Sequence, residues 1–446
     1  MTAPALSMKE LRRVVIAAAV GNVIEWYDFY IFGSLATILS VQFFEPGRPG
    51  AALIRTLGTF VAGFLIRPLG AFVFGRVGDL VGRKYTFLIT LSGMGLSTAL
   101  IGFVPGYATI GALAPILLLG LRLIQGLCLG GEYGGAITYV AEHVPDAKRG
   151  YYTGWLQTSP TLGIVVSLLV VVGTRQAMGT QAFNAWGWRI PFVLSLLMVA
   201  IAIYIRLRLQ ETPIFQALKA KGQTAANVWR EAFLTSNIKY VLIASIVVLG
   251  EGAVWYSGQF WALFFLQTVK KVDVLTSSTI VGIALLIATP TLILFGWLSD
   301  KIGRKPIILG GFLLAALTYY PLYSALGSVA APGAVNYPIA ILIVAILVSY
   351  VGMVYGPIGA FLAEYFPARI RYTSVSVPYH IGNGWGGGLV NVIPAAVFLS
   401  TQSLGQALIY PIAVPAVAFL LSLFLMPETR KVSIWQPAEV RAPARA

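Results

Sequence analysis

The segment GRVGDLVGRK at residues 75–84 returns 221 residues later as GWLSDKIGRK at residues 296–305. Aspartate, glycine, arginine and lysine keep their places in both copies, and each copy directly follows a long apolar stretch. Glycine permits a tight turn between closely packed helices. Asp79 and Asp300 are able to accept hydrogen bonds from the free amides at the start of a neighbouring helix. The repeat therefore predicts a duplicated helical architecture.

Two further pairs of segments repeat in the same order. Residues 141–145 read AEHVP and residues 363–367 read AEYFP, and Glu-Thr follows both the sixth and the last apolar stretch. Acids and bases at such helix ends are able to pair across the two halves, so we expect them to form gates that close in one state and part in another. The alternative is that they are ordinary loop charges. The expected gate residues are Asp79, Arg83, Glu142, Arg149, Asp300, Arg304, Glu364 and Arg371.

The composition is that of a membrane protein. Of the 446 residues, 58 % are apolar and 11 % are charged, against roughly a quarter charged in soluble proteins. Apolar stretches of about 20 residues, the length that crosses a bilayer, recur along the whole chain. We predict twelve membrane-spanning helices, at residues 14–42, 53–77, 85–104, 110–139, 151–173, 188–208, 239–268, 277–298, 306–327, 337–362, 373–399 and 407–427.

Lysines and arginines orient these helices. With the N-terminus in the cytoplasm, 23 of the 31 basic residues lie in cytoplasmic segments and six lie in or beside outer loops. The positive-inside rule therefore places both termini in the cytoplasm. The same distribution argues against nucleic-acid binding, which a net charge of +15 would suggest in a soluble protein. The first apolar stretch is too long for a cleaved signal peptide and carries Glu25 and Asp28 in its middle.

The longest loop divides the chain into two halves. We expect an all-α membrane protein with two pseudo-symmetric six-helix bundles, at residues 1–208 and 239–428. Residues 209–238 form a cytoplasmic central loop with room for a short surface helix, and residues 429–446 form a cytoplasmic tail. Transporters are commonly built from such repeats, with the substrate site near the midplane between them.

Several segments outside the loops indicate which protein family the chain resembles. They are EWYDF at residues 25–29, RPLG at residues 67–70, RLIQG at residues 122–126, GGEYGG at residues 130–135 and WGWRIPF at residues 186–192. Together with the loop motifs, they resemble the major facilitator superfamily and, within it, the bacterial metabolite:proton symporters. That family includes carriers of proline and betaine, shikimate, α-ketoglutarate and citrate. The resemblance implies proton-coupled uptake of a small carboxylate-bearing metabolite.

Ionisable side chains at bilayer depth are costly unless paired, so they mark functional sites. Glu25 and Asp28 are three residues apart and share a helix face. Their estimated depths permit an Arg67–Glu25 pair and an Arg122–Asp28 pair. We expect Asp28 or Glu25 to bind the co-transported proton, with Glu132 as the next candidate. Arg122 is expected to hold the substrate carboxylate, whereas Arg67 either binds substrate or locks its helix; the alternative for these charges is a static salt bridge.

Aromatic and amide side chains at helical spacing give the C-terminal half the character of a binding wall for a compact polar metabolite. For each aromatic residue the alternative is packing or a place at the lipid interface, and for His380 it is a local hydrogen bond. The expected substrate-binding residues are Arg122, Arg67, Gln157, Glu251, Trp255, Tyr256, Gln259, Tyr355, Tyr379, His380 and Asn383.

These features predict a monomeric proton-coupled symporter in the bacterial inner membrane, which imports a small carboxylate metabolite by alternating access. The alternatives are a symporter of zwitterionic osmolytes such as proline or betaine, and a facilitator or exporter of organic acids without obligatory proton symport. The sequence lacks hydrolase, zinc and nucleotide motifs, so we expect no enzyme, metal or cofactor. Four acids against two arginines inside the spans leave little spare positive charge for a tricarboxylate.

Overall fold

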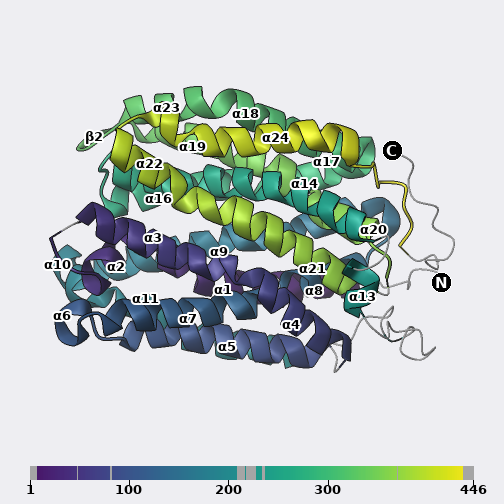
Figure 1. Cartoon of the computed structure of the whole chain (residues 1–446), viewed down its shortest axis with the longest axis horizontal. Coiled ribbons are helices and arrows are strands. Elements are labelled where there is room, and N and C mark those ends of the chain that lie inside the picture. The colour runs from purple at the N-terminus through teal and green to yellow at the C-terminus, as the bar shows by residue number, and fades with distance from the viewer. Residues whose placement is uncertain are drawn as a thin grey trace.

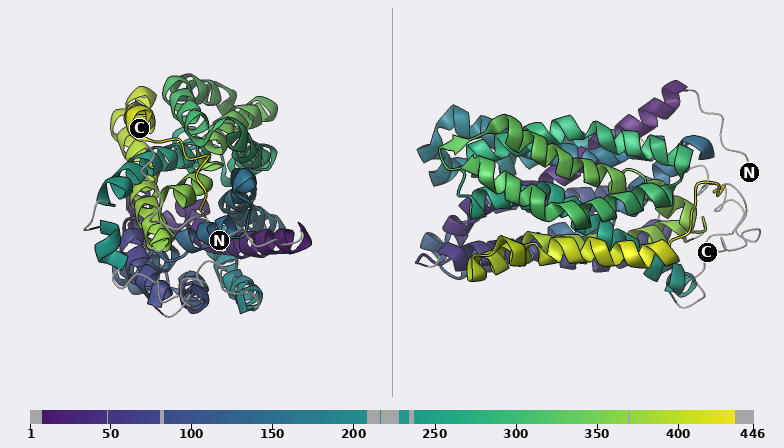
Figure 2. Two further views of the ribbon diagram at one scale, coloured as in Figure 1. Left: turned by 90° about the vertical axis from the view of Figure 1, so that its right-hand side faces the viewer. Right: turned by 90° about the horizontal axis from the view of Figure 1, so that it is seen from above.

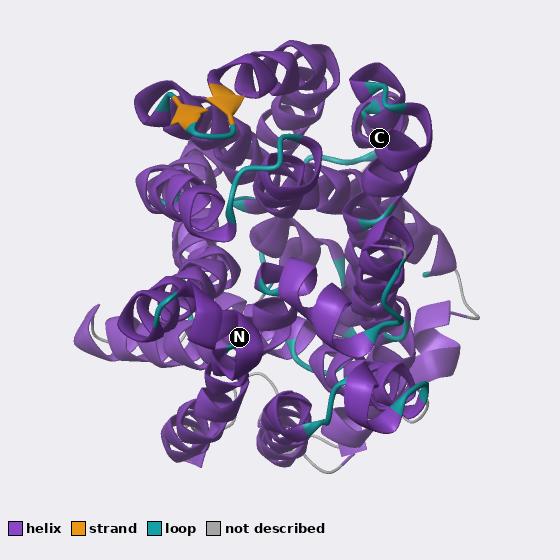
Figure 3. Cartoon of the chain, turned by 90° about the vertical axis from the view of Figure 1, so that its left-hand side faces the viewer, coloured by secondary structure: helices purple, strands orange, loops and turns teal. Residues whose placement is uncertain are grey.

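The computed structural model describes residues 8–47, 49–80, 83–207, 216, 228–233, 237–368 and 370–434. Its long helices run side by side along the longest axis of the molecule (Figure 1). In that view the N-terminal half, in purple and blue, lies below the C-terminal half, in green and yellow. The view along the helices in Figure 3 shows that nearly all of the described chain is helical.

The N-terminal half consists of long apolar helices joined by short turns. A π-helical turn at Phe183–Gly187 joins two of them, and a 3₁₀ turn at Asp146–Lys148 precedes another. The helices are α1 (Met8–Ser34), α2 (Ala36–Phe43), α3 (Pro49–Leu65), α4 (Arg67–Leu80), α5 (Arg83–Phe103), α6 (Tyr107–Ile110), α7 (Leu113–Gly130), α8 (Tyr133–Ala141), α9 (Arg149–Met178), α10 (Thr180–Ala182) and α11 (Arg189–Leu207).

The C-terminal half repeats this construction and adds one small hairpin. Strands β1 (Ala330–Ala331) and β2 (Ala334–Val335) pair antiparallel. Helix α13 (Val228–Phe233) lies in the central loop, and most of that loop lies outside the described residues. The other helices are α14 (Ile238–Tyr256), α15 (Ala262–Phe264), α16 (Val274–Ala288), α17 (Pro290–Ile302), α18 (Arg304–Val329), α19 (Tyr337–Tyr355), α20 (Ile358–Tyr365), α21 (Arg371–Ile381), α22 (Ile393–Thr401), α23 (Leu404–Ala407) and α24 (Ile409–Leu425).

Three π-helical segments interrupt the helices of the C-terminal half. Ser257–Trp261 and Phe265–Val269 continue α14, and Gly382–Gly387 continues α21. A short 3₁₀ segment, Gly388–Asn391, then leads to α22. Such π-segments are rare and are frequent at functional sites.

Within the described residues, eight helices are long and apolar enough to cross a membrane, and a ninth is counted when Thr180–Gly187 and Arg189–Tyr204, bent by 63°, form one span. This is fewer than the twelve predicted. The three other predicted spans coincide with α1 and α2, with α5, in which Leu88–Phe103 is a shorter apolar helix, and with α24. The eight are Pro49–Val77, Leu113–Ala141, Asp146–Met178, Ile238–Val269, Val274–Ile302, Arg304–Val329, Tyr337–Tyr365 and Arg371–Thr401.

Glycines let the helices of the N-terminal half approach closely. A Cβ atom at Gly126 would overlap the carbonyl oxygen of Gly63, and one at Gly130 would overlap that of Arg67. Gly126 and Gly130 are four residues apart, a spacing that allows close helix contact, and α7 packs against both α3 and α4. Arg67 is thereby fixed at the junction between α3 and α4.

The two halves meet along a few helix pairs. Helix α9 packs against α16 and α17, and α21 packs against α4 and α8. The start of α1 and the end of α24 lie at the same end of the bundle, on the right in Figure 1 and in the right-hand view of Figure 2. The candidate functional site lies along this interface between the two halves.

Candidate functional site

Arg122 on α7 is completely buried and is held by neutral groups. Its Nη1 atom donates to Gln125 Oε1 at 2.7 Å and to the Phe29 carbonyl at 3.2 Å, and its Nη2 atom donates to the Phe60 carbonyl at 3.3 Å. The guanidinium carbon lies 4.1 Å from the centre of the Phe29 ring, 4.7 Å from that of Phe32 and 4.9 Å from that of Phe60. Arg122 therefore lies inside a cage of three aromatic rings.

Arg67, at the first position of α4, is also completely buried, and three aromatic rings lie around its guanidinium. Its guanidinium carbon lies 4.0 Å from the centre of the Phe64 ring, 4.3 Å from Phe29 and 5.3 Å from Trp26. None of its three nitrogen atoms has a hydrogen-bond acceptor among the residues that the structure describes. All of its N–H donors therefore remain available.

The two ion pairs predicted from helix depth are absent from the described part of the chain, because no ion pair of Arg67 or Arg122 occurs within 4.0 Å there. Helix depth permitted these pairs, but it does not specify the direction in which a side chain points around its helix. Trp26 and Phe29 occupy the face of α1 that meets the arginines. Aromatic rings therefore take the place that the carboxylates were expected to fill.

The carboxylates of the N-terminal half are buried elsewhere. The Glu25 carboxylate lies 3.3 Å from the side-chain amide of Asn22. Asp28 lies near Ser195 of α11, and its two carboxylate oxygens have no hydrogen-bond partner of good geometry in the described chain. Glu132, in the break between α7 and α8, accepts a 2.7 Å hydrogen bond from Thr90 Oγ1. All three carboxylates are at least 99 % buried.

A chain of hydrogen bonds connects Arg122 to the surroundings of Asp28. Gln125, which accepts from Arg122, donates through Nε2 to Thr98 Oγ1 at 2.7 Å. Thr98 Oγ1 in turn lies 3.5 Å from the backbone carbonyl of Asp28. Gln125 and Thr98 were not predicted as site residues, although Gln125 lies within the segment RLIQG at residues 122–126.

The C-terminal half contributes a carboxylate and an amide. Both Glu251 oxygens on α14 accept from Asn383 Nδ2, at 3.4 and 3.3 Å. His380, one turn before Asn383, is completely buried, and neither ring nitrogen has a partner among the described residues; the same holds for the side-chain amide of Gln259. Arg67 lies within electrostatic range of His380. Glu251, His380 and Asn383 therefore lie together on the C-terminal side of the interface between the two halves.

Tyrosines join the halves beside this face. The Tyr133 ring on α8 stacks on the Tyr379 ring on α21, with centroids 3.3 Å apart. Gln157 Nε2 donates to Tyr133 Oη at 3.1 Å and to the Tyr355 carbonyl at 3.0 Å, and the Tyr355 and Tyr379 hydroxyls lie 3.1 Å apart. Gln157, Tyr355 and Tyr379 are therefore neighbours, as expected of one site, and Tyr133 was not predicted.

A second aromatic group also crosses between the halves. Tyr30 stacks between Trp26 and Trp255, at centroid distances of 5.0 and 5.5 Å. The Tyr30 hydroxyl lies 3.0 Å from that of Tyr256. Trp255 and Tyr256 were predicted, whereas Trp26, Phe29 and Tyr30 were not. Their spacing of three and four residues places them on one face of α1, and this pattern is the signal that was available in the sequence.

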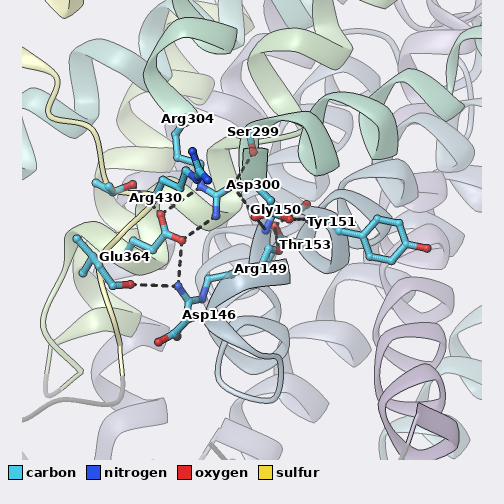
Figure 4. A network of polar contacts seen from close by, with 12 residues as sticks. Asp146, Arg149, Gly150, Tyr151, Thr153, Ser299, Asp300, Arg304, Glu364 and Arg430 are labelled. Atoms are coloured by element: carbon cyan, nitrogen blue, oxygen red, sulfur yellow. Dashed lines mark hydrogen bonds and ion pairs between the residues drawn. The ribbon is translucent and has the colours of Figure 1, made fainter. Parts of the chain in front are cut away.

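At the end of the bundle where α1 begins and α24 ends, Asp300 of the C-terminal half caps a helix of the N-terminal half (Figure 4). Its two carboxylate oxygens accept from the amides of Gly150 at 2.9 Å and Tyr151 at 2.8 Å, in the first turn of α9. Arg304 Nη1 donates to the same carboxylate at 2.6 Å. The predicted interaction between the loop aspartate and the free amides of a helix start is present.

Charged pairs surround this cap. Glu364 Oε1 lies 2.9 Å from Arg149 Nη1 of the other half and 3.0 Å from Arg304 Nη2 (Figure 4). Arg371 Nη1 lies 2.9 Å from Glu142 Oε1, also across the halves. These side chains are completely buried. The side chains of Asp79 and Arg83, the other two predicted gate residues, lie outside the described residues.

Comparisons with known proteins agree with this architecture. A family model described as "Sugar (and other) transporter" matches residues 14–239, and the "Major Facilitator Superfamily" model matches residues 271–445. The xylose transporter XylE from E. coli, in a partially occluded inward-open conformation, superimposes with a TM-score of 0.73 at 19 % identity. That match covers 95 % of this chain and 100 % of XylE.

Curated relatives match almost end to end. The alpha-ketoglutarate permease of Escherichia coli is 35 % identical, over 94 % of this chain and 95 % of its own. The glycine betaine/proline/ectoine/pipecolic acid transporter OusA of Dickeya dadantii is 34 % identical, over 94 % and 84 %. The citrate-proton symporter of Salmonella typhi is 33 % identical, over 88 % and 89 %. The chain is a transporter and not an enzyme, and it belongs to the major facilitator superfamily, among the metabolite:proton symporters.

Proposed function

We propose that this chain is a proton-coupled symporter that imports a small carboxylate-bearing metabolite by alternating access. The observation that carries the proposal is the pair of buried guanidinium groups, Arg122 and Arg67, which have no carboxylate partner in the described chain. An unpaired buried charge is costly, and an anionic substrate would offset that cost. The alpha-ketoglutarate and citrate-proton relatives have names that fit such a substrate.

The proposed topology has twelve spans, both termini in the cytoplasm, and an inner-membrane location in a bacterium. The positive-inside distribution supports it. The bent pair, α1 with α2, α5 and α24 would complete the set of spans around the eight long helices. The proposed units are bundles at residues 1–208 and 239–428, the central loop at 209–238 and the tail at 429–446, in a monomer.

The proposed proton site is Asp28, with Glu25 and Glu132 as the other candidates. Asp28 is fully buried, and its carboxylate oxygens accept no hydrogen bond of good geometry from a described residue. A proton bound to this carboxylate would make the side chain neutral. The hydrogen-bond chain through Gln125 and Thr98 connects its backbone to Arg122. Substrate at Arg122 and a proton at Asp28 would thereby influence one another.

The proposed binding wall faces these arginines from the C-terminal half. It comprises Gln157 of the N-terminal half together with Glu251, Trp255, Tyr256, Gln259, Tyr355, Tyr379, His380 and Asn383. The proposed gates lie towards the cytoplasm. They are the Asp300–Arg304–Glu364–Arg149 network and the Glu142–Arg371 pair, with Asp79 and Arg83 in the corresponding loop of the first half.

A zwitterionic osmolyte is the second candidate substrate. Glu251 beside the aromatic rings of Trp255 and Tyr256 offers a place for a cationic group, and the OusA relative transports betaine and proline by its name. A facilitator or exporter without obligatory proton symport is the remaining alternative. It would move the same substrate without accumulating it.

Reconstituted vesicles test the proposal. Acidification outside should drive accumulation of radiolabelled α-ketoglutarate or citrate above equilibrium, with alkalinisation of the medium. Asp28→Asn should abolish accumulation but retain exchange of internal for external substrate, whereas Asp273→Asn, the same change at an exposed aspartate, should behave as wild type. Uptake without accumulation would identify a facilitator, and uptake of glycine betaine alone would identify the osmolyte carrier.

A further inference from the structure

We infer that the central site takes a short dicarboxylate, with the Arg67 and Arg122 guanidinium groups binding one carboxylate each. This inference rests on the proposed function and narrows its substrate class. It follows from where the two positive charges lie, what surrounds them, and which donors remain unused.

The two guanidinium groups share one aromatic ring. The guanidinium carbon of Arg67 lies 4.3 Å from the centre of the Phe29 ring, and that of Arg122 lies 4.1 Å from the same centre. The two carbons therefore cannot be further apart than the sum of these distances. Carboxylates bound to both arginines would have to be close together, which favours a short chain between them.

The local positive charge is not balanced by nearby acids. Glu132 accepts from Thr90, and Glu251 accepts from Asn383, rather than from either arginine. No ion pair of Arg67 or Arg122 occurs among the described residues. Although the spans contain more acids than arginines, no direct ion pair neutralises either guanidinium among the described residues. Two uncompensated charges match a dianion.

The hydrogen-bond donors that lack an acceptor also favour a ligand with two carboxylates. Arg67 has no acceptor for any of its nitrogens, and Arg122 has none for Nε. A guanidinium group presents a planar fork that binds a carboxylate through two parallel hydrogen bonds. Trp255 Nε1, which only donates, also lacks an acceptor in the described chain. The site thus offers donors for oxygen atoms at more than one position.

Other charge types leave part of the site unsatisfied. A monocarboxylate would neutralise one guanidinium and leave the other buried and unpaired, unless both clamp the same group. The cationic end of a zwitterion would lie near two positive charges, which repel it. A short dicarboxylate is the ligand that satisfies both arginines without introducing a repelling charge.

The test compares each dicarboxylate with its own monoamide. Saturated four-, five- and six-carbon dicarboxylates and their monoamides are titrated at neutral pH into the purified full-length protein in nanodiscs, with glycine betaine in parallel. Each pair has the same length and shape, so the difference reports the second carboxylate. For at least one chain length the dicarboxylate should bind at least about tenfold more tightly, the size of a lost charge-assisted hydrogen bond.

Two variants assign that preference. Arg67→Gln should reduce the preference to within about twofold, because only one guanidinium then remains to bind a carboxylate. Arg55→Gln, the same change at an exposed arginine, should leave both affinities unchanged. The wild-type comparison stands by itself if Arg67→Gln does not fold.

Each other outcome has a distinct meaning. Equal binding of dicarboxylate and monoamide at every length would overturn the inference and would indicate two arginines on one carboxylate, with the proposed function intact. A preference that survives in folded Arg67→Gln would also overturn it. Binding of glycine betaine without any carboxylate would instead overturn the proposed function itself.

Discussion

Neutral groups stabilise the buried guanidinium group of Arg122. Its three hydrogen bonds go to an amide and two backbone carbonyls, and three rings face the guanidinium. A hydrogen bond to a charged group contributes about 1.5–3 kcal/mol, and a desolvated cation–π contact about 2 kcal/mol. Arg67 has only the cation–π contacts. More of its burial cost therefore remains for a ligand to offset, and Arg67 should be the more sensitive of the two to bound anion.

Asp273 provides a residue-scale test at the other end of the bundle. Its carboxylate caps α16 by accepting from the amides of Leu275 at 2.9 Å and Thr276 at 3.1 Å. Partial burial alone would raise its pKa, but these hydrogen bonds outweigh that effect and hold the pKa below its usual value. Asp273→Ala should lower the unfolding free energy by about 1 kcal/mol at neutral pH, as for other lost N-caps.

The pH dependence of that loss has a defined sign. Because the folded-state pKa is depressed, the charged cap contributes above the unfolded pKa of about 3.9 and loses its contribution as the pH falls through the lower folded value. The thermal unfolding difference between wild type and Asp273→Ala should therefore shrink in acid. Asp273→Asn keeps the acceptor and should retain most of the stability at neutral pH. A difference that stays constant into acid would contradict the capping account.

The sequence predicted that charged residues at the helix ends interact across the halves, but it did not predict the neighbours of the buried arginines. Arg304 contacts both Asp300 and Glu364, and Glu364 also contacts Arg149. The internal repeat indicates these positions because it places charged residues at equivalent helix ends of the two halves. The partners of Arg67 were not predictable from depth, since the direction of a side chain around a helix depends on the packing of several helices. Aromatic partners of an arginine carry no charge, so the sequence indicates them only through aromatic residues at helical spacing.

At the scale of elements, the crossing of α9 and α17 has almost no free space. A Cβ atom at Gly150 would overlap the carbonyl oxygen of Gly296, and it would lie 2.7 Å from Ser299 Oγ. This crossing lies directly beside the cap formed by Asp300. A side chain at residue 150 should therefore hold the two halves apart at this end.

Gly150→Val should reduce uptake by at least about tenfold, whereas Gly173→Val should have little effect. Both residues lie in α9, and the added Cβ atom at Gly173 meets nothing within 4 Å, so the pair separates crowding from helix propensity. Transport and substrate binding are measured in the same vesicles, and Gly150→Val should still bind. Normal transport by Gly150→Val would show that this crossing need not close.

Element boundaries were predicted well where apolar stretches are long, and less well where helices break. The predicted stretch at 239–268 coincides with Ile238–Val269, because its length and hydropathy leave no other structure. The bend of 63° before Arg189 and the π-segments after α14 and α21 were not predicted. These interruptions depend on local packing rather than on apolar periodicity.

At the scale of the whole molecule, the last described segment of the chain joins both halves. Glu428 accepts from the amides of Arg304 and Lys305 at the start of α18, both at 3.0 Å. Thr429 Oγ1 donates to Glu364 Oε2 at 2.7 Å, and Arg149 Nη1 of the other half lies 3.5 Å from the Val432 carbonyl. We call residues 426–434 the C-terminal strap. Its contacts link charged residues of both halves at this end of the bundle.

Removing the strap should therefore shift the molecule towards a state that is open at this end. Spin labels at Lys148 and Lys301, which are both exposed and lie on opposite halves, report the opening as a distance distribution in nanodiscs. A chain that ends at Met426 loses the contacts of Glu428, Thr429 and Val432, and it should populate longer distances than wild type. A chain that ends at Ile434 keeps them and should match wild type. If the shorter chain gives the wild-type distribution, the buried pairs between Arg149, Arg304 and Glu364 alone suffice to hold the halves together.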